Sequence, residues 1–155
     1  MIFEMKQIGV MHSPYKTKKE CPVQFASKPD GRGIVEVFPE YAEGLKDIEG
    51  FSHIIVFYCF DRAGDVQLVR KPFLDDDSHG IFATRHPCRP NPIGISIVSL
   101  LERKDNILNI KGVDVLDGTP LLDVKPYVPK FDDVEGAIGG WVDPKPFRPK
   151  PDGRE

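Results

Sequence analysis

The even spread of proline and glycine is the feature that most limits what this chain can fold into. Fifteen prolines and fourteen glycines stand among its 155 residues, and both residue types end helices and mark turns. Between them lie short runs rich in β-branched residues, which favour strands. The pattern therefore predicts a mostly β domain with many strands joined by turns, and it argues against a helical bundle.

Three runs carry the periodicity of a sheet. Residues 6–13 alternate in hydropathy, residues 33–38 are rich in β-branched side chains, and residues 93–101 are followed by a turn and a return strand. Gly112, where the return strand changes parity, is predicted to form a β-bulge that bends the sheet toward closure. Pro126 should make the following strand an edge strand or a bulged one.

The chain also offers one strand with two apolar faces and one short helix. Residues 53–60, HIIVFYCF, are apolar at nearly every position, which suits a central strand covered on both sides by a helix or by a partner subunit. The helix is predicted in PEYAEGLKDIEG, where Tyr41, Leu45 and Ile48 share one face and a proline stands near the first turn.

Size and charge bound the class of protein. A chain of 155 residues is one domain of ordinary size. Its formal net charge of -3 excludes a uniformly basic nucleic-acid binder, so a polyanionic partner would have to meet a local basic patch. We expect residues 1–132 to form the domain, and the proline-rich, charged residues 133–155 to form a C-terminal extension or arm.

Cysteine usage and hydropathy predict an intracellular protein. Cys21, Cys59 and Cys88 are odd in number and widely spaced, which favours reduced thiols. The longest apolar run, residues 54–60, is far shorter than the roughly 20 residues that span a bilayer. The first residues also lack the basic and apolar regions of a signal peptide. We therefore expect a cytoplasmic protein without a membrane segment.

The most polar and most rigid segment is GIFATRHPCRPNPIG, residues 80–94. Its prolines stiffen the backbone around Arg85 and Arg89, so their guanidiniums lose less entropy on binding a carboxylate or a phosphate. The alternative is a proline-rich turn whose arginines pair with nearby carboxylates. His86 and Cys88 lack the spacing of a tetrahedral metal site, and a packing cysteine is simpler than a nucleophile. No metal is expected.

Charged residues elsewhere have simpler interpretations. The aspartates at 75–77 are predicted to lie in a solvated loop that caps the following strand. Basic side chains form either ordinary solvated surface or a rim that meets RNA phosphates. The residues of this rim are Lys16, Lys18, Lys19, Arg70, Lys71 and Arg89.

Residues 80–94 closely resemble the signature of the TsaA/TrmO (YaeB-like) family of S-adenosylmethionine-dependent tRNA methyltransferases. The resemblance extends through IGVMHSPY (8–15), PVQ (22–24), GFSHIIVFYCF (50–60) and DVLDGTPLLDVKPYVP (114–129). It implies a small antiparallel β-barrel of the TsaA type, with one or two short helices and an extended C-terminal tail. It also implies a homodimer whose S-adenosylmethionine sites lie where the subunits meet. The implied reaction is methylation of the exocyclic nitrogen of threonylcarbamoyladenosine, next to the anticodon of tRNA.

The resemblance further implies which residues bind the ligands. The cofactor-binding positions are Pro22, Val23, Gln24, Phe60, Asp61, Arg85, Ile95, Val115, Leu116, Asp117 and Gly118. At two of these positions, Val23 and Asp61, the family pattern has an arginine and a histidine. Contacts with the tRNA anticodon loop are expected from Arg89, Asn91 and Lys125.

The reaction requires a group that accepts or orients a proton, because the acceptor nitrogen loses a proton on methylation. Asp117 and Tyr127 are the candidates for a base or an orienting group. The alternatives are a turn-capping side chain for Asp117 and a packing residue for Tyr127. A second function also stays open, that of an S-adenosylmethionine-binding protein of the same fold with a non-tRNA substrate or a sensing role.

Overall fold

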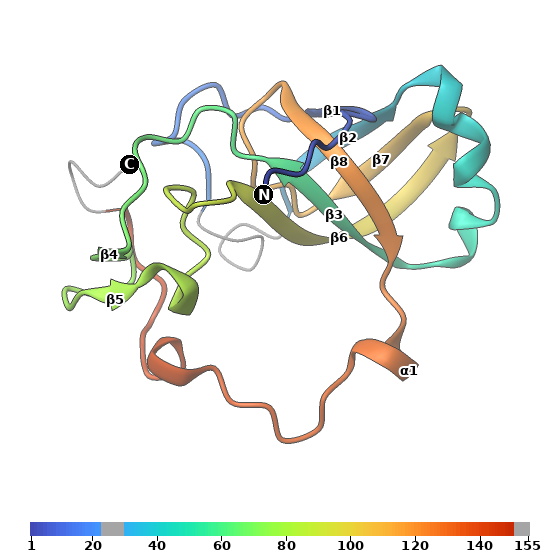
Figure 1. Cartoon of the computed structure of the whole chain (residues 1–155). Helices are drawn as coiled ribbons and strands as arrows, with labels where there is room; N and C mark the ends of the chain where they lie inside the picture. The colour runs from blue at the N-terminus through green and yellow to red at the C-terminus, as the bar shows by residue number, and fades with distance from the viewer. Residues whose placement is uncertain (23–29, 151–155) are drawn as a thin grey trace.

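Six antiparallel strands close into a barrel in the computed structural model, which describes residues 1–22 and 30–150 (Figure 1). Around the barrel they follow the order β1-β2-β7-β6-β3-β8. Their bounds are β1 Gly9–His12, β2 Arg32–Val37, β3 His53–Cys59, β6 Ile93–Lys104, β7 Ile107–Lys111 and β8 Thr119–Pro126. The predicted mostly β fold, closed into a small antiparallel barrel, is confirmed.

Alternate residues of the strands fill the barrel. Inward-facing side chains such as Met11, Leu108 and Leu121 are fully buried, as period-two alternation requires for a sheet with one face on a core. Gly94 stands opposite Tyr58 in the β3–β6 pair. A Cβ at position 94 would lie 2.1 Å from a carbon of the tyrosine ring, so the ring crosses the strand at a place that only glycine leaves open.

Two predicted strand irregularities lie elsewhere. The prediction of a bulge at Gly112 is wrong. This glycine, with φ of 94°, follows the last residue of β7 and ends the strand. The register shift of the β6–β7 pair lies instead between Leu100 and Glu102. The edge strand expected from Pro126 is wrong as well, because β8 pairs with both β1 and β3. The bulged alternative is confirmed by a register shift opposite the end of β3.

The predicted short helix is two 3₁₀ segments instead, η2 Pro39–Leu45 and η3 Ile48–Gly50. Asp47 between them adopts a left-handed conformation with φ of 71°, which interrupts the helical hydrogen bonds. The other helical pieces are η4 Ile81–Ala83, α1 Pro129–Asp132 and η5 Gly140–Val142. No helix within residues 1–22 and 30–150 is long and apolar enough to cross a membrane.

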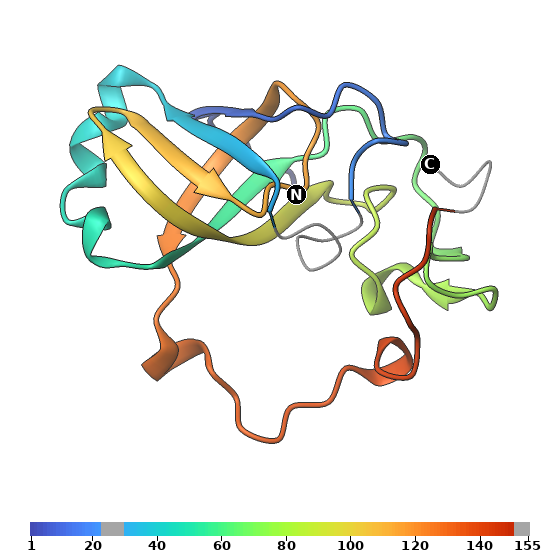
Figure 2. The same cartoon turned by 180° about the vertical axis from the view of Figure 1, so that it is seen from behind.

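A small lobe and a long arm stand beside the barrel. The lobe, residues 61–92, carries the two-stranded ribbon of β4 Val69–Arg70 and β5 His79–Gly80. The arm, residues 133–150, leaves the end of β8 through α1, passes below the barrel in both views and returns to the lobe (Figures 1 and 2). Barrel and lobe are therefore joined twice, once by the chain between β3 and β6 and once by the arm.

Candidate functional site

Most residues expected to bind a methyl donor converge at one end of the barrel, which we call the lobe end. β3 ends here and β6 and β8 begin here, because Cys59 pairs with Ile93 and Tyr58 pairs with Leu121. The Phe60 N–H continues this contact by donating to the carbonyl before Ile93, at 2.8 Å. The lobe end therefore holds the expected residues Phe60, Asp61, Ile95, Val115, Leu116, Asp117 and Gly118.

The segment after β1 reaches the same end. Buried Cys21 donates through its thiol to the Asp114 carbonyl at 3.0 Å, which places its neighbour Pro22 beside the 115–118 turn. Burial raises the pKa of the Cys21 thiol to about 12, so it is protonated and no nucleophile. Val23 and Gln24 lie outside the described residues. Together with Cys59 and Cys88, Cys21 is a free thiol.

A buried polar chain lies beneath the lobe end. The Tyr58 hydroxyl is 2.9 Å from the Ser96 hydroxyl, which donates to Asp114 Oδ1 at 2.5 Å. Burial raises the pKa of Tyr58, and the charge of the Asp114 carboxylate raises this pKa further. The hydrogen bond to Ser96 and the charge of Arg85 lower it, but by less. The lobe end therefore holds a buried carboxylate, that of Asp114.

Asp117 is fixed at the rim of this end. Its Oδ1 accepts the Ser13 N–H at 3.0 Å, and its Oδ2 lies 2.5 Å from Lys16 Nζ. The hydrogen bonds from Lys16 and Ser13, in that order, lower the pKa of Asp117. An ionised carboxylate with a lowered pKa is a weak base. It is better suited to orient a cation or a hydrogen-bond donor than to remove a proton.

Tyr127 and Lys125 lie at the other end of β8. The eight residues of this strand separate them from the Asp117 turn by roughly 25 Å. The Tyr127 hydroxyl donates to Asp133 Oδ1 at 2.5 Å, and this bond raises the pKa of Tyr127. Lys125 is exposed on the outer face, with its Nζ 3.1 Å from Asp123. Within one chain, neither residue reaches the lobe end.

The two arginines of residues 80–94 differ in their surroundings. Arg89 Nη1 donates to three carbonyls of its own loop, those of Ile81 at 3.4 Å, Thr84 at 2.9 Å and His86 at 3.4 Å. This network favours a loop-shaping role for Arg89 over the expected contact with RNA. Arg85 is exposed, and so is Asn91.

His86 packs inside the same loop as a neutral ring. Its Nδ1 accepts the N–H of Cys88 at 3.1 Å, which a protonated imidazole could not do. Burial, followed by the charges of Arg70 and Lys18, lowers the pKa of His86 to about 4. In the part of the chain that the structure describes, no three histidine, cysteine or acidic side chains gather as metal ligands.

The predicted basic rim is partly engaged within the chain. Lys16 is held by Asp117, and Arg89 is held by its own loop. Lys18, Lys19 and Lys71 are exposed. The last three residues are the ones whose charges remain directed to solvent.

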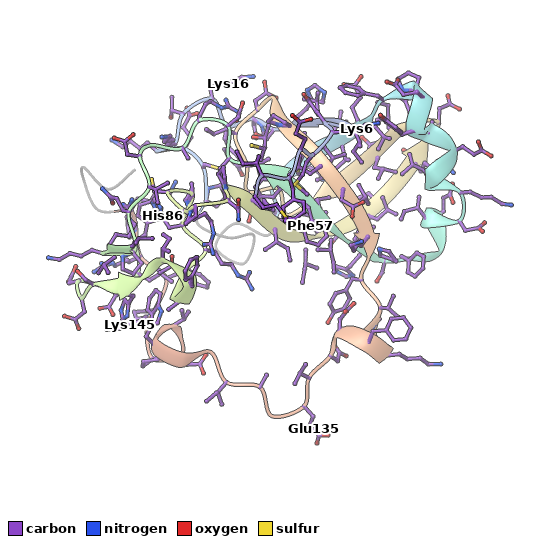
Figure 3. All side chains as sticks on the ribbon, in the orientation of Figure 1. Lys6, Lys16, Phe57, His86, Glu135 and Lys145 are labelled. Carbon is purple, nitrogen blue, oxygen red and sulfur yellow. The ribbon has the colours of Figure 1, made fainter. Side chains whose placement is uncertain are left out.

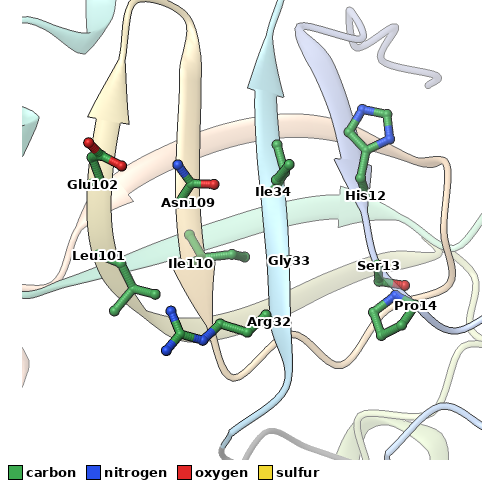
Figure 4. Close-up of a pocket in the computed structure, with 10 residues that line it drawn as sticks. All are labelled: His12, Ser13, Pro14, Arg32, Gly33, Ile34, Leu101, Glu102, Asn109 and Ile110. Carbon is green, nitrogen blue, oxygen red and sulfur yellow. The ribbon is translucent and has the colours of Figure 1, made fainter.

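An open groove of about 840 Å³ crosses the outer face of β1, β2, β7 and β6 (Figure 4). His12, Ile34, Asn109 and Glu102 form one cross-strand row along it. The groove adjoins the site, because His12 Nδ1 lies 3.8 Å from Asp117 Oδ1. Nothing in the sequence points to this groove, since its residues come together only through strand pairing.

A buried cluster in the lobe also escapes sequence reasoning. The prediction that residues 75–77 form a solvated loop is wrong for Asp75. This residue is 6% exposed, and its carboxylate oxygens lie 2.8 Å from His79 Nε2 and 3.0 Å from Lys145 Nζ. The hydrogen bonds from His79 and then Lys145 hold the pKa of Asp75 well below its usual range. The available signals were the four-residue spacing of Asp75 and His79 and the single tryptophan, Trp141, in a polar tail.

Comparison with known proteins decides the family. The model of the tRNA-methyltransferase O N-terminal domain matches residues 10–133, which is most of the chain and includes every residue named above at the lobe end. The chain belongs to the tRNA-methyltransferase O family. The resemblance carried by residues 80–94 is thereby confirmed.

Relatives within the tRNA-methyltransferase O family carry two kinds of name. A "probable S-adenosyl-L-methionine-binding protein" of Pyrococcus abyssi is 57% identical over 138 residues, which are 89% of this chain and 75% of the relative. The tRNA (adenine(37)-N6)-methyltransferase of Escherichia coli K12 is 36% identical over 154 residues, 93% of this chain and 66% of the relative.

Solved structures of the family share the fold. A crystal structure of TrmO superimposes with a TM-score of 0.79 at 37% identity, over 90% of this chain. The chain spans 64% of the length of that TrmO chain.

Proposed function

We propose that this chain is an S-adenosylmethionine-dependent methyltransferase that modifies the exocyclic nitrogen of threonylcarbamoyladenosine next to the anticodon of tRNA. The observation that carries the proposal is the gathering of the family's expected donor-binding residues at the lobe end, within the matched residues 10–133. Residues 1–132 would form the methyltransferase domain. A tRNA substrate places the protein in the cytoplasm.

The residues at the lobe end fit the chemistry of S-adenosylmethionine, which carries an ammonium, a sulfonium and a carboxylate. Asp117 and Asp61 offer carboxylates to its cationic groups, and Arg85 offers a guanidinium to its carboxylate. Phe60, whose ring meets Tyr58 edge-on at 5.4 Å, and Ile95 provide apolar walls. The turn at 115–118, held by hydrogen bonds of its backbone to Ser13, Tyr15 and Met11, would lie against the sugar and base. Pro22 completes this set, as do Val23 and Gln24, whose positions are not described.

The bound donor supplies an electrophilic methyl group. The protein then has to hold the acceptor nitrogen in line with that group and exclude water, and such alignment alone is worth several kcal/mol. The nitrogen lone pair is delocalised into the purine and the carbamoyl carbonyl, which also makes the N–H proton easier to remove. Asp117, kept ionised by Lys16, would accept a hydrogen bond from this N–H and orient it. As the N–CH3 bond forms and the S–CH3 bond breaks, the nitrogen becomes cationic and its proton passes to solvent.

We propose in addition that two copies of the chain complete each site. The outer face of β3 and β6 carries Ile55, Phe57, Ile93, Ile95 and Ile97, paired across the two strands. Ile93 is 40% exposed, and a contiguous apolar sheet face calls for a cover. Two copies packed through this face about a two-fold axis perpendicular to the strands would run their β8 strands in opposite directions.

This arrangement gives a role to the residues at the far end of β8. Tyr127 and Lys125 of one copy would approach the lobe end of the other. Lys125 could then bind the threonyl carboxylate or a phosphate of the tRNA, and the Tyr127 hydroxyl could orient the acceptor. Asn91 would line the entrance for the anticodon loop, and Arg89 would shape the loop that carries it.

Substitution of Arg85 tests the assignment of the site. Arg85→Ala should weaken S-adenosylmethionine binding at least tenfold, measured by isothermal titration calorimetry, because the guanidinium contact to the donor carboxylate is lost. Arg32→Ala, an exposed arginine on the groove face, should bind like the wild type. Unchanged affinity of Arg85→Ala would remove residues 80–94 from the donor site. Donor binding without methyl transfer to tRNA would favour the sensing or non-tRNA function.

A further inference from the structure

The arm returns to the lobe at the very loop that carries Arg85. It lies beyond residues 10–133, the part matched by the family model. We propose that Trp141 of the arm is a positioning residue, which holds residues 80–94 in the conformation that binds the methyl donor. The proposal rests on the proposed function for the role of Arg85, and it adds a determinant of that function outside the matched domain.

Trp141 contacts the lobe through both its ring and its N–H. The indole stacks on the His79 imidazole, with centroids 4.4 Å apart and planes 12° from parallel. Its Nε1 donates to the Ala83 carbonyl at 2.8 Å. Ala83 is the last residue of η4 and stands two residues before Arg85. One side chain therefore joins β5 to the start of the Arg85 loop.

Two adjacent carbonyls before Arg85 are held from opposite parts of the chain. The Ala83 carbonyl accepts from Trp141 of the arm, and the next carbonyl, that of Thr84, accepts from Arg89 Nη1 of the loop itself at 2.9 Å. Each bond fixes one peptide plane, and together they set the direction in which the backbone enters Arg85. The Thr84 N–H of the same peptide unit also donates to the Ile81 carbonyl at 3.1 Å, so the Trp141 bond ties this ordered peptide to the arm.

Buried charge secures the arm in this position. Asp75, 6% exposed, accepts from His79 Nε2 at 2.8 Å and pairs with Lys145 Nζ at 3.0 Å. The imidazole that stacks on the indole is thus itself held by the carboxylate that binds the arm. Arg148 Nε adds a bond to the Phe73 carbonyl at 2.8 Å. Such partly desolvated pairs are stronger than surface salt bridges.

The middle of the arm contributes little to this docking. Residues 131–140 are all exposed, and Glu135 lies at the turn of the arm, far from the barrel and from the lobe (Figure 3). The contacts that hold the arm to the lobe therefore concentrate in residues 141–150, where Lys150 adds a bond to the Lys18 carbonyl and lies over the Phe73 ring. A change at Trp141 acts on the loop, whereas a change at Glu135 leaves the anchor intact.

Donor affinity gives the first test. Trp141→Ala should weaken S-adenosylmethionine binding about tenfold in calorimetry, which corresponds to about 1.4 kcal/mol. Trp141→Phe, which keeps a ring for His79 but has no N–H for Ala83, should fall between this variant and the wild type. Glu135→Ala is the matched control in the same arm and should bind like the wild type. Melting curves verify that each variant is folded.

Trypsin gives a second readout that does not depend on the donor. Within residues 80–94 trypsin can cut only after Arg85, because Arg89 is followed by proline. Trp141→Ala should speed this cut severalfold in the absence of S-adenosylmethionine, and Glu135→Ala should not. Faster cutting in a protein that does not bind the donor would keep the positioning role and overturn the proposed function. Wild-type cutting and wild-type affinity in Trp141→Ala would overturn the positioning role.

Discussion

Asp117 illustrates how surroundings decide the role of a residue. Its two oxygens are occupied by the Ser13 N–H and by Lys16, and its pKa is lowered in consequence. The same carboxylate in an apolar pocket would have a raised pKa and could act as a base. Here the lowered pKa keeps it charged at neutral pH, and its contribution is orientation.

Asp117→Asn tests that role. The amide oxygen can still accept the Ser13 N–H, so the turn should fold, but the charge that orients the reactants is lost. We expect kcat/KM for methyl transfer to fall ten- to a hundredfold, measured with labelled donor and tRNA. Glu36→Gln is a matched control, because Glu36 also contacts His12, at 2.9 Å, but lies on β2, away from the 115–118 turn. Wild-type kcat/KM in Asp117→Asn would contradict the assignment.

The roles of individual residues were the hardest feature to predict from the sequence. Arg85 and Arg89 have the same composition around them, yet Arg89 binds three carbonyls of its own loop while Arg85 is exposed beside the site. Asp75 is one of three consecutive aspartates, a pattern that predicts a solvated side chain, yet it is buried against a segment seventy residues away in the sequence. Local pattern does not encode such long-range partners, so neither difference could be predicted.

At the scale of elements, residues 80–94 form a preorganised loop. Its order comes from prolines, from the Arg89 network and from His86, a neutral ring that accepts the Cys88 N–H at 3.1 Å. Preorganisation lowers the entropy lost when a ligand is bound. The loop should accordingly lose order when His86 is forced to take up a proton.

Acid should therefore destabilise this loop. The pKa of His86 is about 4 in the fold against 6.5 ordinarily, so the unfolded chain binds more protons between these values. Its contribution to stability is complete above about pH 6.5 and is lost as the pH falls toward 4. Allowing for partial exposure, the free energy of unfolding should drop by about 1 to 2 kcal/mol between pH 7 and pH 5.

Urea unfolding at the two pH values measures this drop. His86→Gln, which has no proton to gain, should show a smaller decrease than the wild type over the same interval. Equal decreases in both proteins would mean that His86 does not carry the pH dependence. Asp75 does not interfere, because its lowered pKa makes it titrate in far stronger acid.

Element boundaries were predicted well where periodicity was strong. The apolar run 53–60 predicts the central strand β3, which pairs with both β6 and β8. The helix predicted from Tyr41, Leu45 and Ile48 failed, because a single left-handed residue, Asp47, splits the segment. Hydrophobic periodicity indicates which face of an element is buried, but it does not indicate a local change in the backbone angle φ.

At the scale of the whole molecule, the barrel leaves an apolar face and an arm with exposed apolar side chains. Phe131, Val134 and Ile138 are 80%, 71% and 88% exposed. β3 and β6 lie along the side of the barrel that faces the arm in both views (Figures 1 and 2). A second copy packed on this face would cover both surfaces and would bring the far end of its β8 to the site.

A charge placed on this face tests the proposed dimer. Phe57→Glu should convert a dimer to a monomer in light scattering, because the carboxylate would be buried in an apolar interface. It should also lower methyl transfer at least tenfold, since each site would lose the partner's Tyr127 and Lys125. Leu101→Glu, 43% exposed on the groove side, is the control and should stay dimeric. A monomeric wild type with full activity would contradict the two-copy site.

The methylated nucleoside itself tests the central claim most directly. The protein is incubated with S-adenosylmethionine carrying a labelled methyl group and with tRNA that contains threonylcarbamoyladenosine, and the digested nucleosides are identified by mass spectrometry. We predict labelled threonylcarbamoyladenosine heavier by one methyl group, with the label on the exocyclic nitrogen, and no product from the same tRNA without the threonylcarbamoyl group. Donor binding without this labelled nucleoside would contradict the proposed function.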